Sequence, residues 1–171
     1  MNIVLIGMPG SGKSKLGFIV AKKLFMRFID TDGMIAFKYG SADNIFYKYG
    51  EEYFRKIETE AVKEACSYKN AVISTGGGTA LTDENMKYLK ADGIVVFLDA
   101  GAETVFERTR RRPRPVLSGG DINMIEELLI KRRPFYEKYA DYTLDADGFG
   151  TEEKVRQIIN FYNKGKNDKI N

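Results

Sequence analysis

A glycine-rich segment near the start of the chain, residues 7–14 (GMPGSGKS), has residue types and spacing suited to holding phosphate. Glycines permit a tight turn in which successive backbone N–H groups point inward toward an anion. A helix expected to begin near Gly12 adds the positive end of its dipole. Lys13 can reach the β- and γ-phosphates, and the Ser14 hydroxyl can ligate Mg²⁺. A plain strand-to-helix turn is the alternative, but the complete motif in this context predicts a nucleoside triphosphate site.

Acidic residues at the ends of two predicted strands are candidates to hold Mg²⁺ together with Ser14. Asp30 ends the strand at 27–30, and Asp32 follows two residues later; Asp99 ends an apolar strand at 94–98, as a Walker-B acid does. Two close acids are costly unless a cation or a hydroxyl-bearing ligand offsets their repulsion. The structural alternatives are an Asx turn or helix cap at 30–32 and a turn residue at Asp99, and the residues alone leave both candidates open.

Three further features are candidates for contact with a second, anionic substrate. The glycines at 76–78 follow the predicted strand at 71–74 and form either a bare turn or a backbone surface that a ligand can approach closely. Arg55 lies in an apolar helical stretch three residues before Glu58, where it forms either a surface ion pair or a carboxylate contact. Basic residues also cluster at 108–114 and at 131–133, where they form solvated helix faces, an RNA patch or the contacts to nucleotide and substrate.

Composition narrows the possible chemistry. The chain has no histidine, which excludes a histidine general base, a Ser-His-Asp triad and histidine-ligated metals, whereas phosphoryl transfer needs none of these. Cys66 is the single cysteine, so an internal disulfide is impossible, which is typical of the reducing cytoplasm. No apolar run approaches the length of a membrane span, and we expect no leader segment and no membrane contact. The net charge of +3 does not by itself indicate nucleic acid.

The expected secondary structure alternates between strands and helices and suits one domain. Strands are expected at 3–6, 27–30, 71–74, 94–98 and 142–144. Helices are expected at 16–24, 43–65 with a break near Gly50, 82–89, 102–111, 121–139 and 151–163, with 164–171 frayed. This alternation predicts an α/β fold, in which a parallel sheet has helices on both faces. Ligands bind such sheets beyond the carboxyl ends of the strands, where all the candidate segments above converge.

Taken together, the motifs resemble those of the shikimate kinase family over residues 1 to about 160. They are the phosphate loop, Asp30-Thr31-Asp32, the pattern Gly-Glu-x-x-Phe-Arg-x-x-Glu at 50–58, Gly76-Gly77-Gly78 and Arg114-Pro115-Val116-Leu117. The resemblance implies the P-loop fold of nucleoside monophosphate kinases, a three-layer α/β/α arrangement with a five-stranded parallel sheet. It also implies one kinase domain over 1–171, with a lid at about 111–121 and a substrate-binding helical segment at about 32–62.

The resemblance implies transfer of the γ-phosphoryl group from ATP to shikimate, giving shikimate 3-phosphate in aromatic amino acid biosynthesis. Lys13, Asp32 and Arg114 are the catalytic residues implied. The other implied roles are ATP binding by Gly10, Ser11, Gly12, Lys13, Ser14, Lys15, Arg108 and Arg114, shikimate binding by Asp32, Arg55, Gly76, Gly77, Gly78 and Arg132, and Mg²⁺ binding by Ser14 and Asp30. Arg133 beside Arg132, and Arg111 or Arg112 beside Arg108, are alternatives for the roles of their neighbours.

Two rival functions are kept open by the residues. Another small-molecule P-loop kinase, acting on gluconate or a nucleoside monophosphate, would share the fold and the phosphate loop. An RNA-dependent NTPase would use the arginine clusters, but the regularly interleaved aromatics of a single-strand platform are missing, so we expect no nucleic-acid partner. The expectation is therefore a cytoplasmic, monomeric kinase that binds ATP, Mg²⁺ and shikimate.

Overall fold

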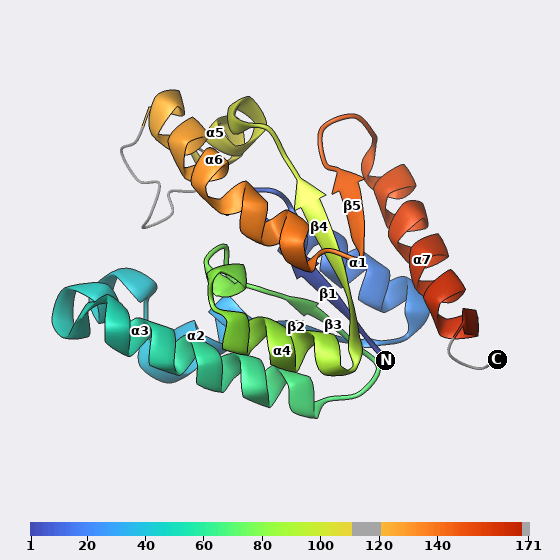
Figure 1. Ribbon diagram of the computed structural model, residues 1–171, viewed down its shortest axis with the longest axis horizontal. Coiled ribbons are helices and arrows are strands. Elements are labelled where there is room, and N and C mark those ends of the chain that lie inside the picture. Colours follow the sequence, from blue (N-terminus) through green and yellow to red (C-terminus); the bar gives the residue numbers. More distant parts are fainter. Residues whose placement is uncertain (111–120, 169–171) are drawn as a thin grey trace.

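Five strands form the central sheet of the part of the chain that the structure describes (Figure 1). The computed structural model describes residues 1–110 and 121–168. The strands are β1 (Asn2–Ile6), β2 (Arg27–Asp30), β3 (Ala71–Ser74), β4 (Gly93–Asp99) and β5 (Tyr142–Asp145). They lie in the order β2-β3-β1-β4-β5, and each neighbouring pair is parallel. The expected five-stranded parallel sheet is therefore confirmed.

Helices cover both faces of this sheet, which confirms the three-layer α/β/α arrangement. They are α1 (Lys13–Leu24), α2 (Thr31–Tyr39), α3 (Ala42–Ser67), α4 (Asp83–Ala91), α5 (Ala102–Arg110), α6 (Ile122–Tyr139) and α7 (Thr151–Asp168), with a short 3-10 turn, η1 (Thr79–Leu81). In Figure 1, α1 and α7 pack together on one face, while α4 and α6 lie on the other and α3 packs against α4. The chain thus buries its sheet between two helical layers.

The three central strands, β1, β3 and β4, form because their apolar residues come in nearly unbroken runs rather than in alternation. No residue of β1 is more than 3% exposed, and β4 is buried from Gly93 to Leu98. Strands covered on both faces need such runs, because neither side of the strand meets water. These central strands therefore hold the core, and the loops that follow them are fixed at one edge of the sheet.

Strand register brings the functional loops together at that edge. Ser74 at the end of β3 is paired with Leu5 of β1 on one side and with Asp30 of β2 on the other. Because the strands are parallel, the segments that follow Ile6, Asp30 and Ser74 leave the sheet side by side. The predicted convergence of these three loops is confirmed.

A second, smaller core joins α2 to α3. It is formed by side chains that are at most 7% exposed, namely Ile35, Ile45, Phe54, Ile57 and Ala61. The ring of Phe46 stacks on that of Phe54, with ring centroids 4.6 Å apart. Gly50 interrupts α3 with a φ of 78° and a ψ of 174°, so the predicted break is confirmed. This small core fixes the helical pair that carries Asp32 and Arg55.

Two expectations about secondary structure are wrong. The pattern along the chain predicted no helix over 31–39, although the resemblance implied a helical segment at about 32–62; α2 begins directly after β2, and Asp30 caps it by accepting a hydrogen bond from the Gly33 N–H at 3.2 Å. The prediction that Asp30 caps a helix is thus confirmed, and a cap does not exclude a second role for its carboxylate. The tail expected to fray from residue 164 instead continues α7 to Asp168, because Tyr162 is buried and Gly165 lies against Ile94 of β4.

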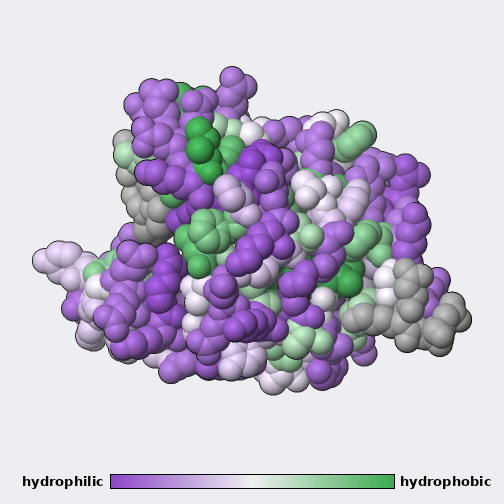
Figure 2. Space-filling view, in the orientation of Figure 1, coloured by the Kyte–Doolittle hydropathy of each residue, from purple (hydrophilic) through white to green (hydrophobic). Residues whose placement is uncertain are grey.

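The visible surface is largely hydrophilic. Figure 2 shows hydrophilic residues over most of this face, with smaller hydrophobic areas among them. Among the described residues, no helix combines the length and apolar character that crossing a bilayer requires.

The close contact of α1 with the sheet gives a stability prediction. A methyl group on Gly17 would lie 2.9 Å from the Phe28 ring and 3.1 Å from Leu5, whereas one on Gly165 would lie 3.7 Å from its nearest neighbour. Gly→Ala adds about 1 kcal/mol of helix propensity at either position, but overpacking at position 17 costs about 1–3 kcal/mol. We expect the free energy of unfolding, measured with urea, to be higher for the Gly165→Ala variant than for the Gly17→Ala variant, by about the overpacking cost. Equal free energies of unfolding for the two variants would contradict this packing.

Candidate active site

The phosphate loop has the backbone conformation that its glycines were expected to provide. Gly7, Gly10 and Gly12 have φ angles of 139°, 82° and 104°, a region that other residues rarely adopt. A Cβ on Gly7 would also lie 2.6 Å from the Leu98 carbonyl oxygen. The loop ends where α1 begins, at Lys13, so the first N–H groups of α1 face the loop. Backbone donors and the helix dipole together make this loop a site for anionic phosphate.

Two side chains of the loop are buried in a manner that suits a phosphate ligand. Lys13 is 7% exposed, and its Nζ donates to the carbonyl oxygens of Gly7 and Met8 at 2.9 and 2.8 Å. The ammonium group is therefore held across the loop opening. The Ser11 hydroxyl is buried and lacks a hydrogen-bond partner among the described residues. A buried, unsatisfied hydroxyl is costly, and a phosphate oxygen would satisfy it.

Oxygen atoms suited to Mg²⁺ meet beside Ser14. Its Oγ donates to Asp30 Oδ2 at 2.6 Å and lies 3.2 Å from the Ser74 hydroxyl. One carboxylate and two hydroxyls fit Mg²⁺, which prefers oxygen ligands and keeps several waters. In residues 1–110 and 121–168 there is no group of three or more acidic, cysteine or histidine side chains that offers a fuller set of ligands. Asp30 is thus beside Ser14, as expected, and Ser74 is an oxygen that the sequence analysis missed.

Asp99, the alternative metal ligand, has a different partner. Both of its carboxylate oxygens accept hydrogen bonds from the Arg133 guanidinium, at 2.8 and 2.5 Å. This two-point contact joins the end of β4 to α6 and occupies the carboxylate that a Walker-B role would require. The geometry therefore favours Asp30 over Asp99.

The three glycines at 76–78 are tightly enclosed by the other candidate residues. A Cβ on Gly76 would lie 2.6 Å from Asp32 Oδ1, and one on Gly78 would lie 2.6 Å from Arg55 Nη1. A Cβ on Gly77 would lie 2.5 Å from Pro9 of the phosphate loop. The segment is thus a bare backbone wall that has Asp32 and Arg55 beside it and the phosphate loop behind it. The interpretation as a simple turn does not account for this crowding.

Arg55 is held by two glutamates that differ in burial. Its Nη1 donates to Glu58 at 3.0 Å and its Nη2 to Glu51 at 3.1 Å. The Glu58 side chain is 2% exposed, and its other oxygen accepts a hydrogen bond from Thr79 at 3.0 Å, whereas the Glu51 side chain is 68% exposed. Burial lowers the pKa of Arg55, but the two carboxylates outweigh burial and raise it. The ion pair with Glu58 is therefore partly buried: its carboxylate lies inside the protein, whereas the Arg55 side chain is 26% exposed.

The neighbouring arginines of α6 point to different partners. Arg132 is 7% exposed and interacts with the hydroxyl of Tyr136, one turn later in the helix. Arg133 instead contacts Asp99 and, at 3.4 Å, Glu137. Because consecutive residues of a helix differ by about 100° in direction, only one of the two can face the interior. The geometry favours Arg132, rather than Arg133, for the inward-facing role.

Basic side chains surround the opposite side of the phosphate loop. Arg108 donates through Nη1 to the carbonyl oxygens of Gly10 and Ser11, at 3.3 and 3.0 Å. Burial lowers the pKa of Lys154, and the nearby charges of Arg108 and Lys15 lower it further. These three cations share one region, and Lys154 is a member that the sequence analysis missed. Arg114, the alternatives Arg111 and Arg112, and the expected lid up to residue 120 lie outside the described residues.

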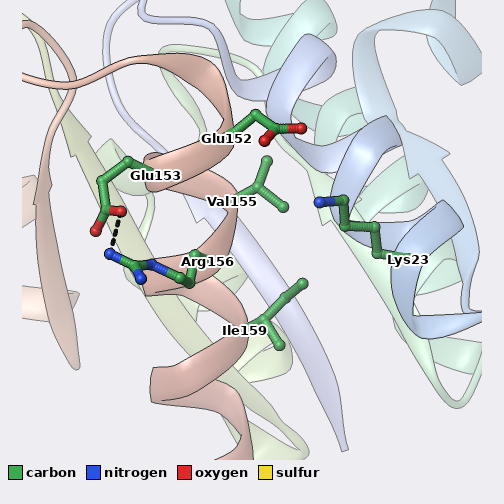
Figure 3. Close-up of a pocket in the computed structure, with 6 residues that line it drawn as sticks. All are labelled: Lys23, Glu152, Glu153, Val155, Arg156 and Ile159. Atoms are coloured by element: carbon green, nitrogen blue, oxygen red, sulfur yellow. Dashed lines mark hydrogen bonds and ion pairs between the residues drawn. The ribbon is translucent and has the colours of Figure 1, made fainter.

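A separate surface hollow between α1 and α7 contains none of the predicted site residues (Figure 3). It is lined by Lys23, Glu152, Glu153, Val155, Arg156 and Ile159. Arg156 forms an ion pair with Glu153 inside it, which Figure 3 marks with a dashed line. Charges of both signs line this hollow, so it does not favour an anionic ligand.

Comparisons with known proteins address the family of the chain. A model of the family "Shikimate kinase" matches residues 9–163. The shikimate kinase of Thermodesulfovibrio yellowstonii is 45% identical over 171 aligned positions that cover 98% of each protein. A solved structure of shikimate kinase from Acinetobacter baumannii, in complex with shikimate, has a TM-score of 0.90 at 34% identity and covers 96% of this chain and 94% of its own.

The gluconate alternative has weaker support. A gluconokinase from Sinorhizobium meliloti has a TM-score of 0.64 at 20% identity, covering 92% of this chain and 88% of its own, which indicates a shared fold alone. The family model and the close relatives together show that the chain belongs to the shikimate kinase family.

Proposed function

We propose that the reaction of this shikimate kinase family member, phosphorylation of shikimate by ATP, takes place where the phosphate loop meets the wall at 76–78. The observation that carries this proposal is the contact between Gly77 and Pro9, which leaves no room for a Cβ. Because of that contact, residues suited to phosphate and residues suited to a carboxylated polyol share one wall. The product is shikimate 3-phosphate, an intermediate of aromatic amino acid biosynthesis.

The ATP side of the site consists of the phosphate loop and nearby cations. Backbone N–H groups of the loop bind the phosphates, and the buried Ser11 hydroxyl donates to one of their oxygens. Lys13 moves from its carbonyl contacts to the β- and γ-phosphates, and Arg108 flanks the adenine. The complete proposed set is Gly10, Ser11, Gly12, Lys13, Ser14, Lys15, Arg108 and Arg114.

The shikimate side consists of Asp32, two arginines and the glycine wall. Arg55 and Arg132 bind the carboxylate of shikimate, a two-point contact that suits guanidinium groups. The exposed Glu51 leaves the Arg55 Nη2 when the substrate carboxylate arrives, while the buried Glu58 keeps the guanidinium in place. Asp32 accepts hydrogen bonds from the ring hydroxyls, and the backbone of Gly76, Gly77 and Gly78 lies against the ring.

Ser14 and Asp30 hold Mg²⁺, directly or through water, with the Ser74 hydroxyl close by. When bound, Mg²⁺ supplies positive charge that offsets the charge of the phosphate oxygens. The proposed domain organisation is a single kinase domain over 1–171 with a substrate-binding segment at about 32–62 and a lid at about 111–121. We also propose a monomer in the cytoplasm, in keeping with the single cysteine.

Positioning and charge stabilisation account for catalysis in this proposal. The transition state of phosphoryl transfer is loose, so little covalent chemistry is required of the protein. Lys13 and Arg114 stabilise the oxygens of the transferred group, while Asp32 orients the attacking hydroxyl and accepts its proton. Exclusion of water from the site limits wasteful hydrolysis of ATP.

The direct test of this function is ADP release from ATP and Mg²⁺ with shikimate, gluconate or AMP as acceptor. We expect release that depends on shikimate and is negligible with the other two. ADP release that depended on gluconate or AMP, or that was the same with and without each of the three acceptors, would overturn the proposal.

Replacing the loop lysine tests the ATP side. Lys13→Met keeps the aliphatic stem but removes the charge, and we expect kcat to fall by about 10²–10³-fold. Lys22→Met, in the exposed last turn of the same helix, is the control and is expected to retain activity. Turnover close to that of the unaltered protein in Lys13→Met, with an unchanged circular dichroism spectrum, would remove Lys13 from the mechanism.

Replacing Arg55 by lysine tests the shikimate side. Arg55→Lys keeps a charge beside the buried Glu58 but loses the planar fork, so we expect the KM for shikimate to rise about tenfold or more. The KM for ATP should change little. Arg156→Lys, which alters an exposed ion pair on α7, serves as the control. An unaltered KM for shikimate would mean that Arg55 serves only the ion pair with Glu58.

The metal assignment is tested by Asp30→Asn. Asparagine caps helices as well as aspartate does, so the N-terminus of α2 and the melting temperature should be preserved. Loss of the carboxylate charge should raise the Mg²⁺ concentration needed for half-maximal activity, by about tenfold. A Mg²⁺ dependence that matched the original protein would argue against Asp30.

A further inference from the structure

Tyr136 is the largest side chain that is completely buried in the described residues. It lies on α6, one helical turn after Arg132, and its ring packs against Phe97 of β4 with centroids 5.0 Å apart. An ordinary core aromatic would need no more than this packing. The position of its hydroxyl, however, relates it to the proposed site.

The Tyr136 hydroxyl contacts two of the segments that form the site. It donates to the carbonyl oxygen of Gly77 at 2.7 Å and lies 3.7 Å from Met8 Sδ of the phosphate loop. Burial raises the pKa of Tyr136 to about 12, although Arg132 opposes the shift. The phenol is therefore protonated at neutral pH and can act as a donor to the Gly77 carbonyl while interacting with Arg132.

The hydrogen bond to Gly77 also determines the direction of the next N–H group. The peptide unit between Gly77 and Gly78 is planar and trans, so its C=O and N–H point in opposite directions. Because Tyr136 holds the carbonyl on its own side, the Gly78 N–H points away from Tyr136. Glycines allow alternative backbone orientations at little cost, so a fixed peptide at this position requires an external restraint.

We propose that Tyr136 is a positioning residue for shikimate, whose hydroxyl fixes the Gly77–Gly78 peptide and relates it to Arg132 on the same helix. The inference rests on the proposed roles of Gly78 and Arg132 in binding shikimate. Without the hydroxyl, the Gly77 carbonyl loses its restraint and the wall can adopt other orientations. The phosphate loop is less affected, because its turn is also held by its own hydrogen bond from the Ser11 N–H to the Met8 carbonyl oxygen, at 3.1 Å.

Tyr136→Phe removes the hydroxyl and keeps the ring against Phe97. We expect the KM for shikimate to rise about tenfold, because the Gly77–Gly78 peptide loses the restraint that orients it, with the KM for ATP and kcat little changed. Tyr139→Phe is the matched control, because that tyrosine lies on the same helix and donates instead to Asp83 on the surface. Its two KM values should remain those of the original protein.

The outcomes separate a positioning role from a structural one. Equal changes in both KM values, or no change in either, would overturn the inference. If Tyr136→Phe does not fold, 3-fluorotyrosine placed at position 136 alone gives a second test. The chemical shift of its fluorine resonance should change when shikimate is added but not when ADP is added. A chemical shift that does not change on addition of shikimate would overturn the inference.

Failure of the inference is also distinguishable from failure of the proposed function. If the unaltered protein releases ADP in a shikimate-dependent manner and Tyr136→Phe keeps its KM for shikimate, only the role of Tyr136 is wrong. If the unaltered protein does not respond to shikimate, the proposed function itself fails, and with it the premise of this inference.

Discussion

Parallel pairing of β1, β2 and β3 is the constraint on which the rest of the site depends. Ser74 is in register with both Leu5 and Asp30, so three loops leave the sheet at one edge. From this register follow the contact of Ser14 with Asp30 and the position of Ser74 beside them. A shift of register would separate these oxygens, and it is opposed because β1 and β3 are buried along their whole length and cannot slide without moving their core residues.

Charge balance is the second organising feature. The site concentrates cations that are needed for anionic substrates, and such cations repel one another unless carboxylates lie among them. Glu58 and Asp99 supply this balance, each by pairing with one arginine. The partly buried pair of Glu58 and Arg55 adds little net stability, because desolvation of Glu58 offsets much of the attraction. The ion pair instead orients the guanidinium group of Arg55, which is held against the glycine wall rather than in solvent.

Much of this arrangement could be predicted from the sequence. Apolar runs predicted the three central strands, and the phosphate loop predicted the edge where ligands bind. The separate helix at 31–39 was missed because it is short and has no break before it, since Asp30 both ends β2 and caps α2. The extension of α7 was missed because 164–168 is polar, and only the contact of Gly165 with Ile94 shows that this end packs on the sheet.

Choices between similar side chains needed tertiary contacts. Asp30 and Asp99 both follow strands, and only the Arg133 contact distinguishes them. Arg132 and Arg133 are adjacent in sequence, and which of the two faces the interior depends on where α6 packs. The role of Tyr136 could not be predicted from the sequence, since a tyrosine with one hydrogen bond occurs in many protein cores. Nothing in the sequence indicates Lys154 either, because its proximity to Arg108 depends on how α7 lies against the loop.

The central claim is that one wall, formed by residues 76–78, separates and aligns two substrates. A crystal structure of the protein with ADP, Mg²⁺ and shikimate tests this claim most directly. The account predicts that the shikimate carboxylate contacts Arg55 and Arg132, with a ring hydroxyl between Asp32 and the phosphate loop. Shikimate bound elsewhere, or with its hydroxyls directed away from the β-phosphate of ADP, would contradict it.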